Sequence, residues 1–266
     1  MTEDEDLVPQ SAAWCERLAG RQRGYFYDWR SVLEPGNGED LYTKLVEQEL
    51  DPSIDVVDAG CGHGEDVLRI APRVRSVVGY DRTRAFIEIA EEERKSAGID
   101  NARFLCADSK PSGMPLPASS IDLFLSRRGP RNWITDAGRV GRPRAVLLML
   151  TPISGDVPAW NDELPGPLRF PRADELPTAL ESSRADIGSR LARIGATRTE
   201  EWYCEVDELF SEPRELYRFR VWGRDSTLLP SYEQSMAALE RIFQKHAASG
   251  RLRIKHRRWI WRAVAP

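Results

Sequence analysis

The sequence predicts an α/β protein built on a mostly parallel sheet with helices on both faces. Between residues 54 and 150, five short apolar runs, several of them β-branched, alternate with spacers of helical character, which is typical of parallel strands joined by crossover helices. After residue 195, two further runs of this kind bring the expected sheet to seven strands. The expected strands are Ile54–Val57, Ser76–Tyr80, Ala102–Leu105, Ile121–Leu125, Ala145–Leu150, Thr197–Val206 and Arg251–Val264.

Amphipathic periodicity and capping residues predict where the helices lie. Gly98 follows one amphipathic stretch in the position that a helix C-cap prefers. Ser231 and Gln234 form a capping-box pattern ahead of a later one. Beyond the N-terminal region, the expected helices lie at 65–71, 83–97, 186–194, 211–222 and 231–249.

The chain is expected to divide into two parts, 1–50 and 51–266. The first part should hold an acidic tail at 1–8, where charge is dense, and a helical cap, because apolar residues recur there at three- and four-residue spacing. The second part should be the cofactor-binding domain. Six prolines between 152 and 177 predict a long loop within it, and loops of this length often serve as lids.

Composition narrows the class of protein. With 266 residues, 41% of them hydrophobic, the chain can bury a sizeable core. No window approaches the roughly 20 apolar residues of a membrane span, and the acidic start is unlike a signal peptide, so we expect a cytoplasmic protein that does not bind membranes. The four cysteines lie far apart without a CxxC pair, which predicts neither a metal site nor a disulfide framework. The four acids at positions 3 to 6 account for the whole net charge of −4. The rest of the chain is therefore close to neutral and has no overall positive potential that would attract nucleic acid.

A glycine-rich loop at 60–64 follows the first strand directly and leads straight into a helix. Glycines there bring bare backbone amides against a ligand, because no Cβ holds it away. The next strand ends in Asp81, where a carboxylate can accept hydrogen bonds from both hydroxyls of a ribose. Glu65 and Asp66 at the helix start would repel a pyrophosphate but tolerate a sulfonium cation, although acids also suit the first turn of any helix. The loop therefore predicts a nucleoside cofactor that is not a dinucleotide.

The segment Val57-Asp58-Ala59-Gly60-Cys61-Gly62-His63-Gly64 resembles motif I of class I S-adenosylmethionine (SAM)-dependent methyltransferases. The resemblance continues at 78–81, at 106–109 and at Leu116-Pro117, and it is good over 51–152. It implies a Rossmann-like class I methyltransferase fold with SAM as the cofactor. It also implies cofactor contacts from Asp58, Gly60, Cys61, Gly62, Asp81, Arg82, Asp108, Ser109 and Ser126.

The resemblance further implies which part of SAM each residue meets. The glycine loop should face the methionine part and Asp81 the ribose. Asp108 and the Ser109 amide should face the adenine edge. Arg82 should lie on the adenine face, where the family usually has an apolar residue, and this departure puts the tightness of adenine stacking in doubt.

The end of the fourth strand, Leu125-Ser126-Arg127-Arg128-Gly129-Pro130, is where methyltransferases of this fold usually recognise their acceptor. The motifs of the amino-methylating and cytosine-C5 DNA enzymes are absent there, and no cysteine is near, which argues against covalent base methylation. Two arginines suggest recognition of a carboxylate or phosphate, since guanidinium binds such groups in bidentate fashion. Alternatively, one or both pair with an acid such as Asp122 or Asp136. Adjacent residues point in different directions, so the two arginines should not be equivalent.

Several aromatic or titratable residues are further candidates for the site. His63 is a candidate general base, or it merely bonds to backbone. Tyr25, Tyr27 and Trp29 close over SAM, clamp a flat substrate or pack the cap against the body, and Trp133 is a candidate for the opposite wall or belongs to the core.

Cations and an aromatic residue interleave in the run 251–259, a pattern that favours RNA binding, although charges on a terminal strand also protect a sheet edge. We favour the interpretation that these charges protect the edge or simply form a solvated surface. The predicted function is transfer of a methyl group from SAM to a small-molecule acceptor, with an anionic one as an option. The alternatives are an RNA methyltransferase and a SAM-binding regulatory protein without catalysis.

Overall fold

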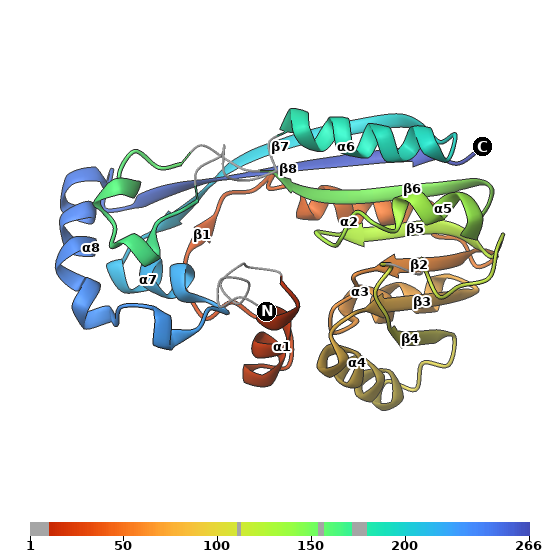
Figure 1. Cartoon of the computed structure of the whole chain (residues 1–266), viewed down its shortest axis with the longest axis horizontal. Helices are drawn as coiled ribbons and strands as arrows, with labels where there is room; N and C mark the ends of the chain where they lie inside the picture. Colours follow the sequence, from red (N-terminus) through yellow and green to blue (C-terminus); the bar gives the residue numbers. More distant parts are fainter. Residues whose placement is uncertain (1–10, 111–112, 154–156, 172–179) are drawn as a thin grey trace.

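The computed structural model describes residues 11–110, 113–153, 157–171 and 180–266, which form one eight-stranded sheet with helices packed on it (Figure 1). The acidic tail expected at 1–8 lies outside the described residues. The strands are β1 (Val32–Leu33), β2 (Asp55–Ala59), β3 (Ser76–Asp81), β4 (Ala102–Cys106), β5 (Ile121–Arg127), β6 (Gly141–Ile153), β7 (Thr197–Phe210) and β8 (Leu252–Val264). The helices are α1 (Ala12–Arg21), α2 (Glu39–Glu49), α3 (Glu65–Ile70), α4 (Arg84–Ser96), α5 (Ile134–Val140), α6 (Leu180–Arg193), α7 (Pro213–Val221) and α8 (Tyr232–His246).

The sheet has the order β1-β7-β8-β6-β5-β2-β3-β4. Strands β2 to β6 pair in parallel, while β8 is antiparallel to both β6 and β7. The mostly parallel α/β fold is therefore confirmed, with a correction to the strand number, which is eight rather than seven. The additional strand, β1, has only two residues and pairs with the end of β7, so it is too short to leave a periodic signal in the sequence.

The elements differ from the expected ones in several places: α6 begins six residues earlier than expected, at Leu180, and β6 is longer at both ends, spanning Gly141–Ile153. Helix α5 was not expected, since its seven residues are too few to show a clear helical period. Strand β7 continues to Phe210, because β8 pairs with it along its whole length despite the acids in its second half. The capping box predicted at Ser231 and Gln234 is present at the start of α8. Among the described residues, no helix is long and apolar enough to cross a membrane.

Helices cover both faces of the parallel strands, as predicted. Neighbouring residues of one strand point to opposite faces, so Val57 and Phe124 contribute to one core layer while Val56 and Leu123 contribute to the other. Helices α5 and α6 cover the first layer, and α2, α3 and α4 cover the second. This packing fixes the carboxyl ends of β2, β3, β4 and β5 along one edge of the sheet.

Strands β7 and β8 extend beyond the other strands and carry α7 and α8, which form a separate lobe on the left of Figure 1. The described part of the loop after β6 packs into this lobe through Trp160, Leu164 and Leu168. The lid expected from this loop is therefore not found among the described residues, which bury their apolar side chains against α7 and α8 instead of covering the sheet edge.

The basic run on β8 faces acids on β7. The antiparallel register places Arg257 opposite Glu205 and Lys255 opposite Asp207. The Lys255 ammonium lies 2.8 Å from Glu205, and the Arg253 guanidinium lies 3.3 Å from Asp207. Cross-strand pairs of opposite charge stabilise a sheet. Strand β8 pairs with β6 on one side and with β7 on the other, so it is not an edge strand of the sheet and the protective interpretation is wrong. The acids on β7 partly neutralise the run, which also weakens the case for RNA binding.

Candidate active site

A cavity of about 450 Å3 lies at the carboxyl edge of β2, β3, β4 and β5, and 13 of the 16 predicted site residues line it. Its floor is the glycine loop that follows β2. Gly60 and Cys61 both donate backbone hydrogen bonds to the carbonyl oxygen of Tyr80, at 2.9 and 3.1 Å, which ties the loop to β3. Gly60 and Gly62 have φ angles of +79° and +54°, a region that glycine adopts without steric penalty. A Cβ at Gly60 would lie 2.6 Å from the Pro130 ring, so close packing also requires glycine there.

Asp81 ends β3 and holds the neighbouring backbone. One carboxylate oxygen accepts from the Gly62 amide at 3.0 Å, and the other accepts from the Thr83 amide at 2.9 Å. An ionised carboxylate has about four acceptor positions, so two of them stay available to ribose hydroxyls. Asp81 thus both shapes the glycine loop and lines the cavity.

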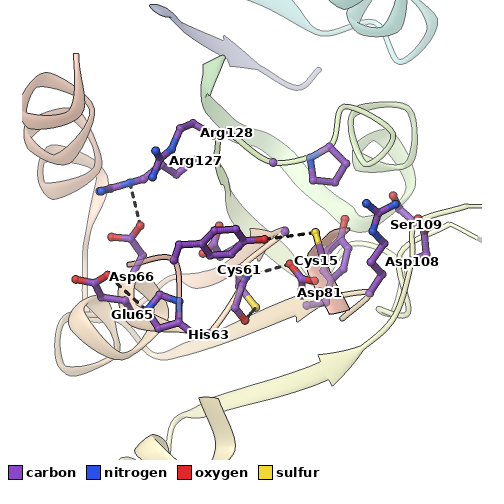
Figure 2. A pocket seen from close by; sticks show the side chains of 18 of the residues that line it. Cys15, Cys61, His63, Glu65, Asp66, Asp81, Asp108, Ser109, Arg127 and Arg128 are labelled. Carbon is purple, nitrogen blue, oxygen red and sulfur yellow. Dashed lines mark hydrogen bonds and ion pairs between the residues drawn. The ribbon is translucent and has the colours of Figure 1, made fainter. Parts of the chain in front are cut away.

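The far end of the cavity is lined by several polar side chains. Asp108 and Ser109 follow β4 and lie beside Asp81 in Figure 2, and Arg82 also lines this end. The hydroxyls of Tyr80 and Ser109 are buried close to each other at this end, and neither makes a hydrogen bond of normal geometry among the described residues. They can pair with each other, and their remaining hydrogen-bonding capacity is available to a polar ligand.

Asp58 is the most perturbed carboxyl group of the cavity. It is 5% exposed, and burial raises its pKa to about 8, with nearby Asp66 adding to the effect and Arg127 opposing it. A cation beside such a buried carboxyl group would stabilise its ionised form. A ligand with a sulfonium and an ammonium group supplies such cations, so the state of Asp58 and the hydroxyls at the other end both fit SAM.

The two arginines after β5 are held differently. Arg127 lies 3.0 Å from Asp66 and donates to the Thr43 hydroxyl at 3.0 Å, so its fork is occupied by acid and hydroxyl partners. Arg128 donates to the Tyr27 hydroxyl at 2.8 Å and has a φ angle of +60°, which is uncommon for a residue other than glycine. The two arginines differ in their partners, but both line the cavity, so the expectation that only one would reach it is not met. The alternative that they pair with acids of the body is met, through Asp66 and Glu39.

Glu39, at the start of α2, lies among three arginines. Its carboxylate is 3.6 Å from both Arg127 and Arg128 and 3.1 Å from the buried Arg258. With Asp66 as the other acid, this cluster contains three guanidinium groups and two carboxylates. The imbalance leaves a net positive charge at the β5 end of the cavity.

The N-terminal segment 24–31 covers the cavity from the other side. Tyr25 lies over the glycine loop, so that a Cβ on Gly62 would be 2.9 Å from its ring. Tyr27 also lines the cavity, next to Arg128. This segment is anchored to β7 and α7, because the Ser31 hydroxyl donates to Glu208 and the Arg30 amide donates to Glu215 at 2.6 Å. The cover predicted from the proline-rich loop thus comes from the N-terminal cap.

His63 lines the cavity with its ring 5.6 Å from that of Phe26. Burial lowers the pKa of His63, while Glu65, 3.8 Å away, opposes the shift. The imidazole is therefore neutral at pH 7 and is able to accept a proton.

Three predicted site residues do not line the cavity. Ser126 is fully buried and donates its hydroxyl to the Ala59 carbonyl, so it joins β5 to β2. Trp133 is core rather than a substrate wall, since it is fully buried and stacks on Phe124 with ring centroids 5.9 Å apart. Trp29 lies behind Tyr27, with ring centroids 4.6 Å apart, and supports the wall without forming its surface.

Gly129 and Pro130 belong to the segment expected to recognise the acceptor, although neither was assigned a role of its own, and both line the cavity. A Gly-Pro pair after a strand is a turn signal that marks such a position. A Cβ at Gly129 would lie 2.5 Å from the Ala59 carbonyl oxygen, so only glycine fits. Trp222 and Glu39 come from distant parts of the chain, and no local pattern connects them to the site.

Comparison with known proteins supports the interpretation of this cavity as a methyltransferase site. Residues 50–169 match a family model described as a methyltransferase domain. A 23S rRNA (uracil(1939)-C(5))-methyltransferase from Aeromonas salmonicida is 33% identical over 104 residues, which are 37% of this chain and 24% of that protein. The chain thus spans about a quarter of the length of this curated relative.

Solved structures share the fold over most of the chain. A functionally unknown protein from Deinococcus radiodurans has a TM-score of 0.63 at 20% identity, with 95% of this chain and 97% of that chain covered. A putative methyltransferase from Bacillus halodurans has a TM-score of 0.58 at 16% identity, with coverage of 85% and 98%. Geranyl diphosphate C-methyltransferase from Streptomyces coelicolor, solved with S-adenosylhomocysteine (SAH), has a TM-score of 0.51 at 13% identity, with coverage of 85% and 77%.

The fold and the site together define a class I SAM-dependent methyltransferase. Residues 50–169 match the methyltransferase-domain family model, and SAM is the cofactor of that family.

Proposed function

We propose that this protein transfers a methyl group from SAM to a small-molecule acceptor that carries an anionic group. The observation behind this proposal is that one cavity of about 450 Å3 holds both the glycine loop with Asp81 and the guanidinium group of Arg128. This volume falls within the range of roughly 300–1,000 Å3 that is typical of small-molecule sites. The proposal includes a cytoplasmic location and the division of the chain into 1–50 and 51–266.

Each group of residues has a role in this proposal. SAM, when bound, supplies the methyl group. The backbone of the glycine loop, Asp58 and Asp81 hold the cofactor, and Arg128 orients the acceptor by its charge. Neutral His63 is the candidate to take a proton from the acceptor, while proximity and alignment supply much of the acceleration in any case.

RNA is the second candidate acceptor, because the Aeromonas relative acts on 23S rRNA. The cysteines of the cavity argue against a covalent route of base methylation. Cys15 and Cys61 are the cysteines among the described cavity-lining residues, and burial together with Asp58 and Asp81 raises the pKa of Cys61 well above its usual value. The Cys61 thiol therefore stays protonated and is a poor nucleophile.

Methyl transfer from radiolabelled SAM tests the proposal. The purified chain is incubated separately with an acidic metabolite fraction and with total RNA of the same cells, and transferred label is counted. We expect label in the metabolite fraction. Label in RNA alone would establish the second candidate, and SAM binding without transfer to either fraction would leave a regulatory protein.

Substitution of the two arginines by lysine should separate their roles. Arg128→Lys keeps the charge but loses the fork, so KM for the anionic acceptor should rise about tenfold while SAM affinity stays within about twofold. Arg127→Lys should mainly lower thermal stability, because Arg127 is tied to Asp66, Glu39 and Thr43. Steady-state kinetics and thermal melting of both variants check this. Equal KM values for both variants and the parent would show that neither arginine contacts the acceptor.

A further inference from the structure

The acceptor end of the cavity has an aromatic wall made by Tyr27 and Trp222. Both residues line the cavity, with ring centroids 5.1 Å apart and ring planes at 65°. Trp29 packs behind them, with centroid distances of 4.6 Å to Tyr27 and 5.7 Å to Trp222. Phe219 packs against Trp29 in turn, at 5.1 Å. The wall is thus held by a second layer of rings and is formed before any ligand arrives.

The polar atoms of this wall are already paired with protein. The Trp222 indole donates to the Phe26 carbonyl at 3.0 Å, and the Trp29 indole donates to Glu208 at 2.9 Å. The Tyr27 hydroxyl accepts from Arg128. What the wall offers to a ligand is therefore apolar ring surface, and Tyr27 remains 51% exposed. Ring surface of this kind favours another ring in stacked or edge-on contact.

The charge beside this wall is positive. Arg128 adjoins Tyr27, and the cluster around Glu39 has more guanidinium groups than carboxylates. Asp66 belongs to the arginine cluster, 3.0 Å from Arg127, while the other carboxyl groups of the cavity come from β2, β3, α3 and the segment after β4, at Asp58, Asp81, Glu65 and Asp108. Figure 2 shows Asp81 and Asp108 at the opposite end from Arg128. An anionic group thus meets attraction at Arg128 and repulsion at the other end.

We propose that the acceptor is a flat aromatic acid whose ring lies against Tyr27 and Trp222 and whose acidic group binds the Arg128 guanidinium. This inference rests on the proposed function and deepens it by naming the class of substrate. The wall selects for a ring, the arginine selects for the negative charge, and both lie on one side of the site. The acidic group replaces Glu39 and Tyr27 as the partner of Arg128.

Binding to the SAH-saturated protein tests this inference without catalysis. The probes are 2-naphthoate, which has both features, cyclohexanecarboxylate, which has the charge without an aromatic ring, and 2-naphthamide, which has the ring without the charge. We expect calorimetry to give at least tenfold tighter binding for 2-naphthoate than for either other probe. Equal binding of cyclohexanecarboxylate would overturn the aromatic half of the inference, and equal binding of 2-naphthamide would overturn the anionic half.

Variants assign the two contributions to residues. Trp222→Leu should weaken 2-naphthoate binding about tenfold and leave the affinity for cyclohexanecarboxylate unchanged. Trp222→Phe keeps an aromatic ring, so it should bind 2-naphthoate almost as tightly as the parent. Arg128→Gln should remove the preference for 2-naphthoate over 2-naphthamide. Arg253→Gln is the matched control, because Arg253 is an exposed arginine paired with Asp207 on the β7–β8 ribbon. Unchanged 2-naphthoate affinity in both cavity variants would place the acid elsewhere and overturn the inference.

Two further measurements separate this inference from the proposed function. SAH affinity, measured first on each variant, shows that the cofactor end is intact. Label transfer to an aliphatic acid in the metabolite fraction would contradict the aromatic acceptor and leave the proposed function standing. Label in RNA alone would overturn both the aromatic acceptor and the proposed small-molecule function.

Discussion

Asp58→Asn should stabilise the cofactor-free protein at pH 8 and weaken its binding of SAM. The pKa of Asp58 is raised to about 8 by burial, and Asp66 adds to this effect. Between pH 4 and pH 8 the folded protein keeps this proton while the unfolded chain loses it, so the contribution of Asp58 to stability falls as pH rises. One pKa unit corresponds to about 1.4 kcal/mol, so the loss amounts to a few kcal/mol by pH 8. Asparagine cannot ionise and avoids this loss.

The same substitution should cost cofactor affinity. A bound sulfonium and ammonium favour the ionised form of Asp58, so SAM binding to the parent should release a proton near pH 7 and tighten as pH rises toward 8. The variant should bind SAM at least tenfold more weakly at pH 8 and release less proton. Urea unfolding at pH 5 and pH 8, together with calorimetry in two buffers of different ionisation enthalpy, measures both effects. Asp100→Asn, at an exposed acid, is the control. Parallel stability curves for the variant and the parent would show that Asp58 ionises normally.

The cofactor half of the site was predictable because its residues follow one another along short stretches of chain. The glycine loop follows β2 directly, Asp81 is the last residue of β3, Asp108 comes shortly after β4, and parallel strands end at one edge of the sheet. Recognising the strands in the sequence is therefore enough to place these residues together. The extra strand β1 was missed because a two-residue strand has no period.

The acceptor half was only partly predictable, because it is assembled by packing between distant segments. Trp222 reaches the cavity at the end of α7, and Glu39 reaches Arg128 from the first turn of α2. Ser126 was incorrectly assigned to the cofactor site because neighbouring residues of β5 point in opposite directions. Arg127 reaches the cavity, whereas the Ser126 hydroxyl donates to the Ala59 carbonyl of β2. Trp133 was misplaced because it precedes α5, whose apolar side packs on the sheet together with it.

Gly62→Val should abolish SAM binding while leaving most of the fold in place. Gly62 has a φ angle of +54°, which is strained for a β-branched residue. Its Cβ would lie 2.9 Å from the Tyr25 ring, so the loop or Tyr25 must move. Either movement disturbs the hydrogen bond from the Gly62 amide to Asp81, which is the residue expected to hold the ribose. We expect SAM affinity to fall more than 100-fold.

The glycine substitution needs a control that adds the same side chain without touching the loop. Gly188→Val serves this purpose, because Gly188 lies within α6 and a Cβ there would have no atom within 4 Å. Circular dichroism and thermal melting should show both variants folded, and calorimetry with SAM should show loss of binding in Gly62→Val only. Adding Tyr25→Ala to Gly62→Val relieves the steric contact but not the backbone strain, so it should restore binding in part. If Gly62→Val bound SAM as tightly as the parent, the cofactor would have to lie away from the glycine loop, and the acceptor assignment at Arg128 would fall with it.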